Sequence, residues 1–252
     1  MSSETVTEEE LARARPPEFT TEKSLVYRVV RRMFWLWFVL VHRFRVEQRD
    51  KLPKTGGCLI VANHQSMLDI PLIACSTDRH VCFVARDTLA KSRAISFLIR
   101  HTGAVMVRRG ASDRAAIREM VQHLQAGDAV AIFPEGTRSK DGSVAEFQRG
   151  MALVARQAGV PIVPAGIRGT LSILPRGASL PRPVRCAIRY GDPLPSSGKA
   201  LDAAREAVLG LVGDGSYGSL PPTCFRPPPG AARRPFVIDL FSSLRNPALP
   251  DP

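Results

Sequence analysis

The sequence predicts an α/β fold in which a mostly parallel central sheet is flanked by helices and preceded by an N-terminal amphipathic helix. From Gly57 onward, short apolar runs rich in β-forming residues alternate with helical patterns, as they do in layered α/β domains. The runs 59–62 and 129–133 are apolar without interruption, which is typical of strands buried on both faces and favours a parallel sheet. With 252 residues and 44% hydrophobic content, the chain can form one sizeable core.

The first predicted element is an amphipathic helix over residues 23–46, which follows a flexible N-terminus of residues 1–22. A helical projection separates an apolar side from a basic side. The apolar side carries Val26, Val29, Val30, Met33, Leu36, Trp37, Leu40, Val41 and Phe44. The basic side carries Arg28, Arg31, Arg32, His42 and Arg43.

This pattern suits a helix that lies at the boundary of lipid headgroups. Its longest uncharged apolar run, 33–41, is about half of the roughly 18–20 residues that a spanning helix needs. The alternative is a helix that packs on the core and leaves its charged side in solvent. We favour the membrane interface, because Trp35 and Val39 interrupt the basic side.

The α/β domain is predicted to cover residues 47–212. The expected strands are 58–62, 81–85, 104–107, 129–133, 162–167 and 184–190. A helix is expected over 112–126, with Ser112 as its N-terminal cap and Gly127 at its end. Because ligands of such sheets meet the loops at the carboxyl ends of the strands, we expect the reactive residues there.

The ends of the chain and its cysteines indicate a cytosolic protein. The first ten residues are polar and acidic, unlike the start of a secretory signal. The five cysteines are odd in number and widely spaced, so buried free thiols are expected, and no cysteine or histidine cluster has the spacing of a zinc site. Residues 213–252 are Pro-rich and predicted to be partly disordered, although 236–241 is apolar enough to dock onto the core, a partner or lipid.

The formal net charge of +12 favours an anionic partner, which can be nucleic acid, an anionic lipid surface or a phosphorylated substrate. A nucleic-acid-binding module would show clustered basic residues with interleaved aromatics. Here the basic residues are dispersed and aromatic residues make up only 6% of the chain. No nucleic-acid partner is therefore expected.

The heptapeptide NHQSMLD, residues 63–69, follows a predicted strand and carries the candidate general base, His64. His64 and Asp69 are five residues apart, so they can meet only if a turn lies between them and a helix begins near Ser66. Asp69 could then orient the imidazole and stabilise its protonated form. Alternatively, the Ser66-x-x-Asp69 spacing is that of a capping box, in which Asp69 only supports the start of the helix.

Two further segments place arginines just after predicted strands. The segment 103–109 ends in Arg108 and Arg109, and the segment 133–139 reads FPEGTRS, with Gly136 allowing a tight turn. Arginine presents a planar set of donors that suits phosphate oxygens. Two such strand ends beside a third that carries His64 favour a common anion site over solvated loop charges.

Taken together, these segments resemble the glycerolipid acyltransferases typified by 1-acyl-sn-glycerol-3-phosphate acyltransferase. Four blocks occur in the family's order: NHQSMLD fits NHxSxxD, GAVMVRR resembles GxxFIDR, FPEGTRS matches the third block, and VPIVP is similar to the proline-containing fourth. The resemblance spans about Gly56 to Leu194. The sequence departs from the family at Met106, where Phe is usual, and at Arg108, where an acidic residue is common.

The resemblance implies that His64 deprotonates an acceptor hydroxyl, which attacks an acyl thioester, while Asp69 positions the imidazole. The implied substrate-binding residues are Asn63, Ser66, Arg109, Glu135, Gly136, Thr137 and Arg138. A covalent acyl-enzyme on Ser66 or Cys58 is the competing mechanism. A membrane-bound scaffold without catalysis is a further alternative.

The expected partners are an acyl thioester donor, a lysophosphatidate-type acceptor and an anionic membrane surface. The donor is acyl-coenzyme A or acyl carrier protein, and neither a cofactor nor a metal is expected. The expected location is the cytoplasmic face of the cell membrane, with peripheral or monotopic attachment.

Overall fold

The computed structural model describes residues 25–86, 105–107, 113–148, 150–175, 178, 180–196 and 200–213. All of them belong to one compact unit, residues 1–218, whereas the second unit, residues 219–252, lies outside the described part. The predictions for residues 1–22, for nearly all of the Pro-rich tail, and for Arg108 and Arg109 also lie outside it.

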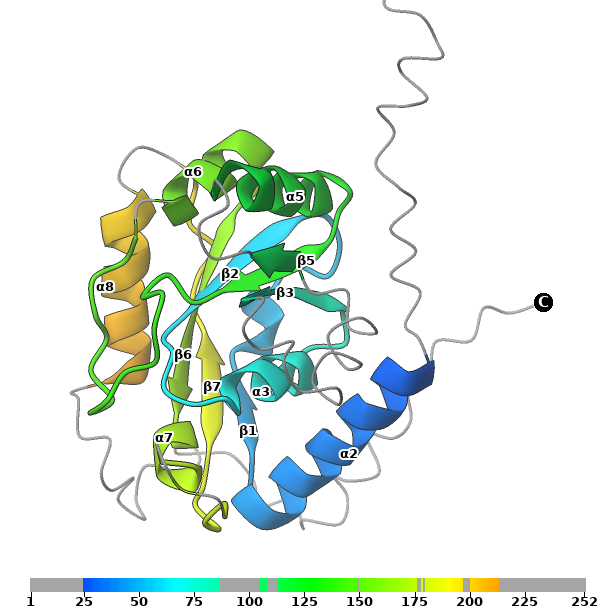
Figure 1. The fold of residues 1–252 in the computed structure, drawn as a ribbon, viewed down its shortest axis with the longest axis vertical. Coiled ribbons are helices and arrows are strands. Elements are labelled where there is room, and N and C mark those ends of the chain that lie inside the picture. Colours follow the sequence, from blue (N-terminus) through cyan, green and yellow to red (C-terminus); the bar gives the residue numbers. More distant parts are fainter. Residues whose placement is uncertain are drawn as a thin grey trace, which may run out of the picture. The chain divides into compact units, whose positions relative to one another are not determined.

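A mostly parallel sheet forms the centre of the described chain (Figure 1). Its seven strands are β1 (Arg45–Glu47), β2 (Cys58–Ala62), β3 (Val81–Arg86), β4 (Val105–Val107), β5 (Ala129–Ile132), β6 (Ile162–Arg168) and β7 (Ala187–Tyr190). Their order is β1-β7-β6-β2-β5-β3-β4, and the five strands from β6 to β4 are mutually parallel. At the other edge β7 pairs antiparallel with β6, and β1 pairs parallel with β7. The predicted fold class is confirmed.

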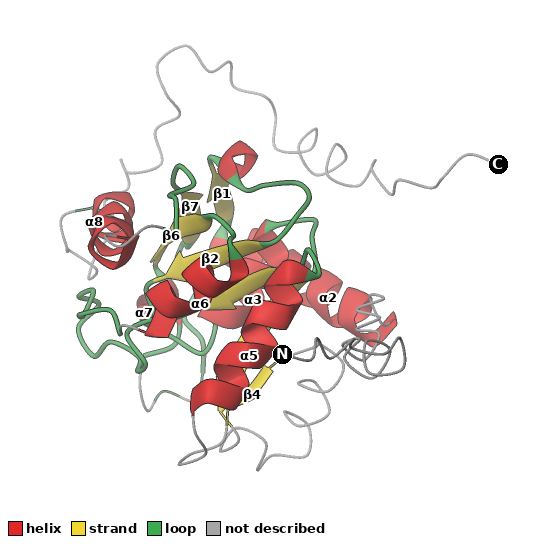
Figure 2. Ribbon diagram, turned by 90° about the horizontal axis from the view of Figure 1, so that it is seen from above, coloured by secondary structure: helices red, strands yellow, loops and turns green. Residues whose placement is uncertain are grey.

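Helices cover both faces of this sheet. They are α2 (Leu25–His42), the 3₁₀ turn η1 (Arg49–Lys51), α3 (Asp69–Ser76), α5 (Asp113–Gln125), α6 (Gly150–Ala158), α7 (Thr170–Ile173) and α8 (Ala200–Val212). Because side chains alternate along a strand, Ile60 of β2 joins a core with α2 and α3, whereas Leu59 joins a core with α5, α6 and α8. Seen from above, α8 and α2 lie on opposite sides of the strands (Figure 2).

Most of the predicted elements occur where the residues indicate. Strand β2 has the expected bounds, and α5 agrees with the predicted helix to within one residue at each end. Gly127 follows α5 with φ of +96°, and its N–H donates to the carbonyl of Leu124 at 3.1 Å. It therefore ends the helix in the left-handed conformation that glycine adopts without strain.

The N-terminal helix is shorter than predicted. Helix α2 ends at His42, where Arg43 takes a left-handed φ of 47°, and residues 45–47 form the edge strand β1. The predicted end at residue 46 was wrong, because the chain pairs with β7 there and the N–H of Arg45 donates to the carbonyl of Cys186 at 3.2 Å. Such a partner is distant in sequence and leaves no local signal.

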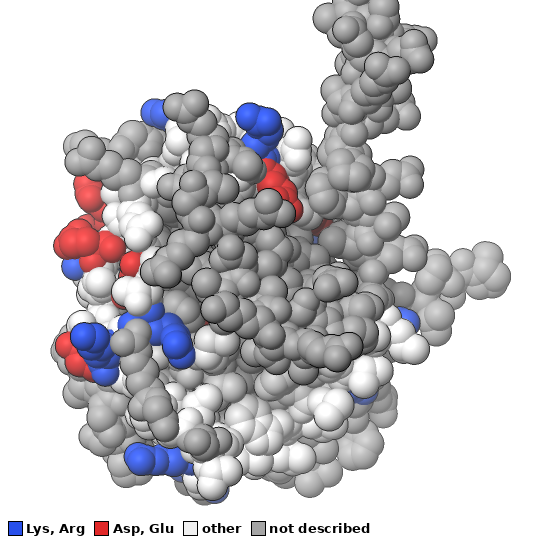
Figure 3. Space-filling view, viewed as in Figure 1, with Lys and Arg blue, Asp and Glu red and all other residues white. Residues whose placement is uncertain are grey.

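Part of the predicted apolar side of helix α2 faces away from the protein, whereas Trp37 and Phe44 of that side pack against the core. Leu25, Met33 and Leu40 are 68%, 64% and 62% exposed. Val29, Leu36 and Val41 are also exposed, and we call these six residues the apolar stripe. Figure 3 shows the surface around α2 as largely uncharged.

The protein-facing side of α2 contains residues that were predicted to face solvent. His42 is buried, and its Nδ1 bonds the carbonyl of Val184 at 2.9 Å. Arg31 donates to the carbonyl of Thr77 and forms an ion pair with Asp78. In the described part of the chain, no helix is both long and apolar enough to cross a membrane.

Gly166 allows α8 to pack closely on β6. A Cβ atom at this position would lie 2.7 Å from Cβ and 2.8 Å from the carbonyl carbon of Leu211. Because the helix would have to shift, Gly166→Ala is expected to lower the free energy of unfolding by about 1–3 kcal/mol in urea denaturation. The control is Gly210→Ala in α8, where a Cβ meets nothing within 4 Å and a gain of about 0.5–1 kcal/mol is expected. Unchanged stability of Gly166→Ala would contradict this packing.

Candidate active site

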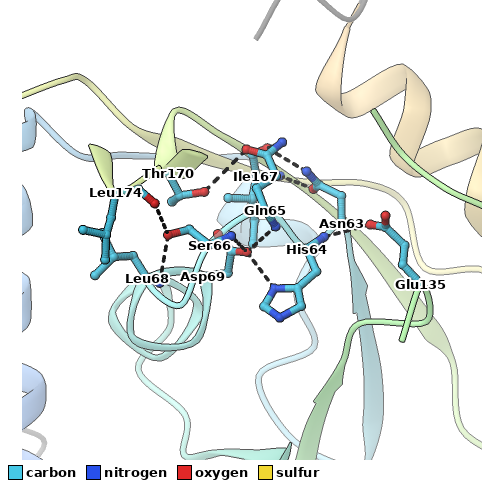
Figure 4. A network of polar contacts seen from close by, with 10 residues as sticks. All are labelled: Asn63, His64, Gln65, Ser66, Leu68, Asp69, Glu135, Ile167, Thr170 and Leu174. Atoms are coloured by element: carbon cyan, nitrogen blue, oxygen red, sulfur yellow. Dashed lines mark hydrogen bonds and ion pairs between the residues drawn. The ribbon is translucent and has the colours of Figure 1, made fainter. Parts of the chain in front are cut away.

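The candidate site begins where β2 ends, at the carboxyl edge of the sheet (Figure 4). Asn63 is buried, and its amide Nδ2 donates to the carbonyl of Ile167 at 3.0 Å. The N–H of Ile167 donates in return to Asn63 Oδ1 at 2.7 Å. This pair of hydrogen bonds joins the ends of β2 and β6, and so fixes the backbone from which His64 projects.

His64 and Asp69 meet through the turn that the sequence requires. Nδ1 of His64 lies 2.8 Å from Oδ2 of Asp69, which is fully buried. The same oxygen accepts from the N–H groups of Gln65 at 2.6 Å and Ser66 at 2.8 Å. Asp69 therefore holds the turn and orients the imidazole, so the two interpretations of the sequence are compatible. Helix α3 begins at Asp69, three residues later than expected, because residues 66–68 form the turn.

The hydrogen bond to Asp69 selects the tautomer of His64. Nδ1 carries the proton that it donates to the carboxylate, which leaves Nε2 as an acceptor. The ring of Phe133, which follows β5, stacks on the imidazole with centroids 4.1 Å apart and planes 16° apart. Since the side chain of His64 is 15% exposed, the imidazole is held in place yet still reaches the surface.

The segment after β5 holds the backbone of His64 on both sides. Oε1 of Glu135 accepts from the N–H of His64 at 2.8 Å, and the N–H of Ser139 donates to the His64 carbonyl at 2.7 Å. The second carboxylate oxygen of Glu135 accepts from the N–H of Ala145 at 3.1 Å. Burial raises the pKa of Glu135, and these two backbone hydrogen bonds oppose part of the rise.

The turn at residues 134–137 depends on Gly136. Its φ is +67°, and an added Cβ would lie 2.2 Å from Nε2 of Gln148. The N–H of Gly136 donates to the carbonyl of Phe133 at 3.1 Å, so it is used within the turn. Thr137 is exposed and Arg138 is half-buried, which places both at the surface of the loop that passes His64.

Several residues predicted to bind substrate make contacts that support His64. Asn63, Ser66 and Glu135 are all buried and bonded within the protein. Oγ of Ser66 accepts from the N–H of Leu68 at 3.4 Å and donates to the carbonyl of Leu174 at 3.5 Å. These contacts give the three residues a supporting role beside His64, and their predicted contact with substrate stays a prediction.

The two candidate nucleophiles are both buried. Ser66 is engaged in the turn, and Cys58 is fully buried at the start of β2. Burial raises the pKa of Cys58, although the nearby Arg79 lowers it in part. A thiol of this kind is mostly protonated and inert, which disfavours a covalent acyl-enzyme.

The sequence did not reveal the contacts from Phe133, Ser139 and Ile167. The first two are the first and last residues of the third sequence block, so a position near His64 could have been predicted for them. Ile167 contributes only backbone atoms, which leave no pattern in the sequence. Arg109, predicted to bind phosphate, lies outside the described residues.

Comparison with known proteins shows which family the chain belongs to. The family model described as "Acyltransferase" matches residues 43–168, which is half of the 252 residues. The chain belongs to the acyltransferase family. The match includes His64, Asp69 and the third block, and it ends at the last residue of β6. Strand β7 lies beyond the matched residues, and β1 joins the sheet by pairing with β7.

Individual relatives carry consistent names. The chain is 33% identical over 136 residues to the chloroplastic 1-acyl-sn-glycerol-3-phosphate acyltransferase BAT2 of Brassica napus, covering 53% of this chain and 39% of the relative. It is 37% identical over 169 residues to an enzyme of the same name from Chlamydomonas reinhardtii, covering 64% and 50%. The chain thus spans half or less of the length of these curated relatives.

A solved structure shares most of the fold. The crystal structure of the 1-acyl-sn-glycerophosphate acyltransferase PlsC from Thermotoga maritima is 29% identical in sequence and superposes with a TM-score of 0.64. The similarity covers 79% of this chain and 83% of that chain. The family's α/β architecture therefore extends over the domain that carries His64.

Glu135 is expected to stabilise the fold through its two backbone hydrogen bonds. Glutamine has one oxygen acceptor, so Glu135→Gln leaves the N–H of His64 or Ala145 facing an NH₂ group. The expected loss in the free energy of unfolding is about 1–3 kcal/mol, measured with urea. Glu146→Gln is the matched control, since this side chain is 88% exposed and its loss should stay within about 0.5 kcal/mol. Equal stability of the two variants would show that Glu135 does not hold His64.

Proposed function

We propose that this chain transfers a fatty acyl group from an acyl thioester to the free hydroxyl of 1-acyl-glycerol-3-phosphate, which yields phosphatidic acid for phospholipid biosynthesis. The observation that carries the proposal is the 2.8 Å contact between His64 Nδ1 and the buried Asp69, which leaves Nε2 as a base near the surface. The names of the relatives and of the solved structure support the choice of reaction and acceptor.

The proposed reaction is a direct transfer. Nε2 of His64 takes the proton of the acceptor hydroxyl, and the hydroxyl oxygen attacks the carbonyl carbon of the thioester. Asp69 stabilises the imidazolium that forms. The tetrahedral intermediate then expels the thiolate, which takes the proton from His64, so the products are the ester and a free thiol. No cofactor takes part, and the thiol carrier is coenzyme A or acyl carrier protein.

The acceptor phosphate is assigned to the loop that passes His64. Thr137 and Arg138 lie at its surface, between the two residues that hold the backbone of His64, Glu135 and Ser139. A guanidinium can bind two phosphate oxygens at once. By its resemblance to the family, Arg109 joins this site, and Arg108 adds positive charge beside it.

We further propose that the apolar stripe of α2 docks the enzyme on a membrane surface. An exposed row of large apolar side chains is costly in water and favourable in the boundary between headgroups and acyl chains. Arg28 and Arg32 are exposed on the same helix and can contact anionic lipid. Attachment is peripheral or monotopic, on the cytoplasmic face, where the four described cysteines, all free thiols, stay reduced.

The catalytic proposal is tested with purified protein, an acyl-coenzyme A and lysophosphatidate, by following thiol release. Loss of a general base lowers kcat by about 10²- to 10⁴-fold, so His64→Ala is expected to lose activity to that extent and Asp69→Asn to follow it. Arg138→Ala is expected to raise KM for lysophosphatidate about tenfold or more, because a charge-assisted hydrogen bond is lost.

The control for this experiment is an acceptor without phosphate. With a monoacylglycerol, Arg138→Ala and the wild type should have the same KM, whereas His64→Ala should remain inactive. Wild-type turnover by His64→Ala would reject the proposed base. An equal KM effect on both acceptors would reject a phosphate role for Arg138.

The membrane proposal is tested by sedimentation with vesicles that contain phosphatidylglycerol. The double variant Met33→Glu/Leu36→Glu is expected to bind more than tenfold less, since burying each apolar side chain stabilises binding by about 1.5–3 kcal/mol. Leu180→Glu/Leu209→Glu is the matched control, because both residues are exposed large hydrophobics outside α2, and it should bind like the wild type. Equal loss in both variants would indicate a charge effect and contradict the proposed role of the stripe.

A further inference from the structure

We propose that Cys82, His123 and Asp128 form a zinc site at the edge of the sheet opposite His64. Cys82 is the second residue of β3, His123 lies in the last turn of α5, and Asp128 immediately precedes β5. The folded chain therefore joins three ligand types that the sequence separates by up to 46 residues. Among the described residues, these three groups are placed so that they could hold one metal ion, which the sequence spacing did not predict.

The distances between the donor atoms suit a tetrahedral ion. Sγ of Cys82 lies 3.6 Å from Nδ1 of His123 and 3.9 Å from Oδ2 of Asp128. Bonds of about 2.3 Å to sulfur and about 2.0–2.1 Å to nitrogen, at a tetrahedral angle, place these two atoms about 3.6 Å apart. Nδ1 of His123 and Oδ2 of Asp128 are 2.8 Å apart, so an ion would replace this hydrogen bond and widen it by about half an ångström.

The surroundings favour a cation. Cys82 and His123 are buried, and the charges of Asp128 and Glu119 both act on the thiol. His123 lies near the carboxyl end of α5, where the helix dipole is negative. A divalent ion would lie between the thiol sulfur, the imidazole nitrogen and the carboxylate oxygen.

The donor set selects zinc from the common divalent ions. One sulfur, one imidazole nitrogen and one carboxylate oxygen match the ligands that Zn²⁺ takes, whereas Mg²⁺ and Ca²⁺ prefer oxygen alone. A second imidazole, that of His80, lies beside the sulfur, with its Nδ1 at 3.8 Å. The role of such a buried site is structural, because a bound ion would link the end of α5 to the amino ends of β3 and β5.

The experiment uses the purified full chain, freed of metal with a chelator and titrated with Co²⁺, whose absorption spectrum reports thiolate ligation and tetrahedral geometry. We expect one Co²⁺ per chain with a thiolate charge-transfer band, displaced by Zn²⁺. Cys82→Ser is expected to abolish the band, and Asp128→Asn to weaken binding about tenfold or more. Cys75→Ser, another buried thiol, which donates to the carbonyl of Arg31, should leave the spectrum unchanged.

Thermal unfolding distinguishes a structural site from binding at the surface. It also tests the proposal if Cys82→Ser does not fold. Zn²⁺ is expected to raise the melting temperature of the wild type and of Cys75→Ser by several degrees, but not that of Asp128→Asn. Wild-type protein without a thiolate band, or a band and a melting shift that survive in Asp128→Asn at wild-type affinity, would overturn the proposal. The result is independent of the proposed acyl transfer, because neither measurement uses substrate.

Discussion

The candidate site depends on the buried carboxylate of Asp69. One of its oxygens accepts hydrogen bonds from the imidazole of His64 and from the N–H groups of Gln65 and Ser66. A carboxylate that is removed from water is stable only with such donors, so the turn and the orientation of His64 form together. The loop after β5 completes the arrangement, since Glu135 and Ser139 bond the two backbone groups of His64. The base is thus held by its side chain and by its own peptide groups.

Because the strands are parallel, the two candidate sites lie at opposite ends of the strands. Strands β6, β2 and β5 are neighbours, so Ile167, His64 and Phe133 meet near their carboxyl ends. The amino ends of β5 and β3 gather Asp128 and Cys82 on the other edge. The proposed reaction and the proposed metal site therefore lie at opposite ends of neighbouring parallel strands.

Helix α2 connects the proposed membrane surface to the candidate site. It packs on α3, whose first residue is Asp69, while its apolar stripe faces outward. The side of α2 that faces the protein includes the buried His42 and the paired Arg31. Under the proposed function, this orientation leaves the apolar stripe for lipid.

The sequence alone determined the parallel sheet, the bounds of β2 and α5, and the candidate pair His64 and Asp69, because these rest on hydrophobic periodicity, turn residues and local spacing. It could not determine β1, whose three residues are a strand only through pairing with β7. Nor could it show that Asn63 bonds Ile167 and that Glu135 bonds the backbone of His64, because these partners are distant in sequence. Only the tertiary structure brought Cys82 to His123, because contacts between distant segments follow from packing, which leaves no local pattern in the chain.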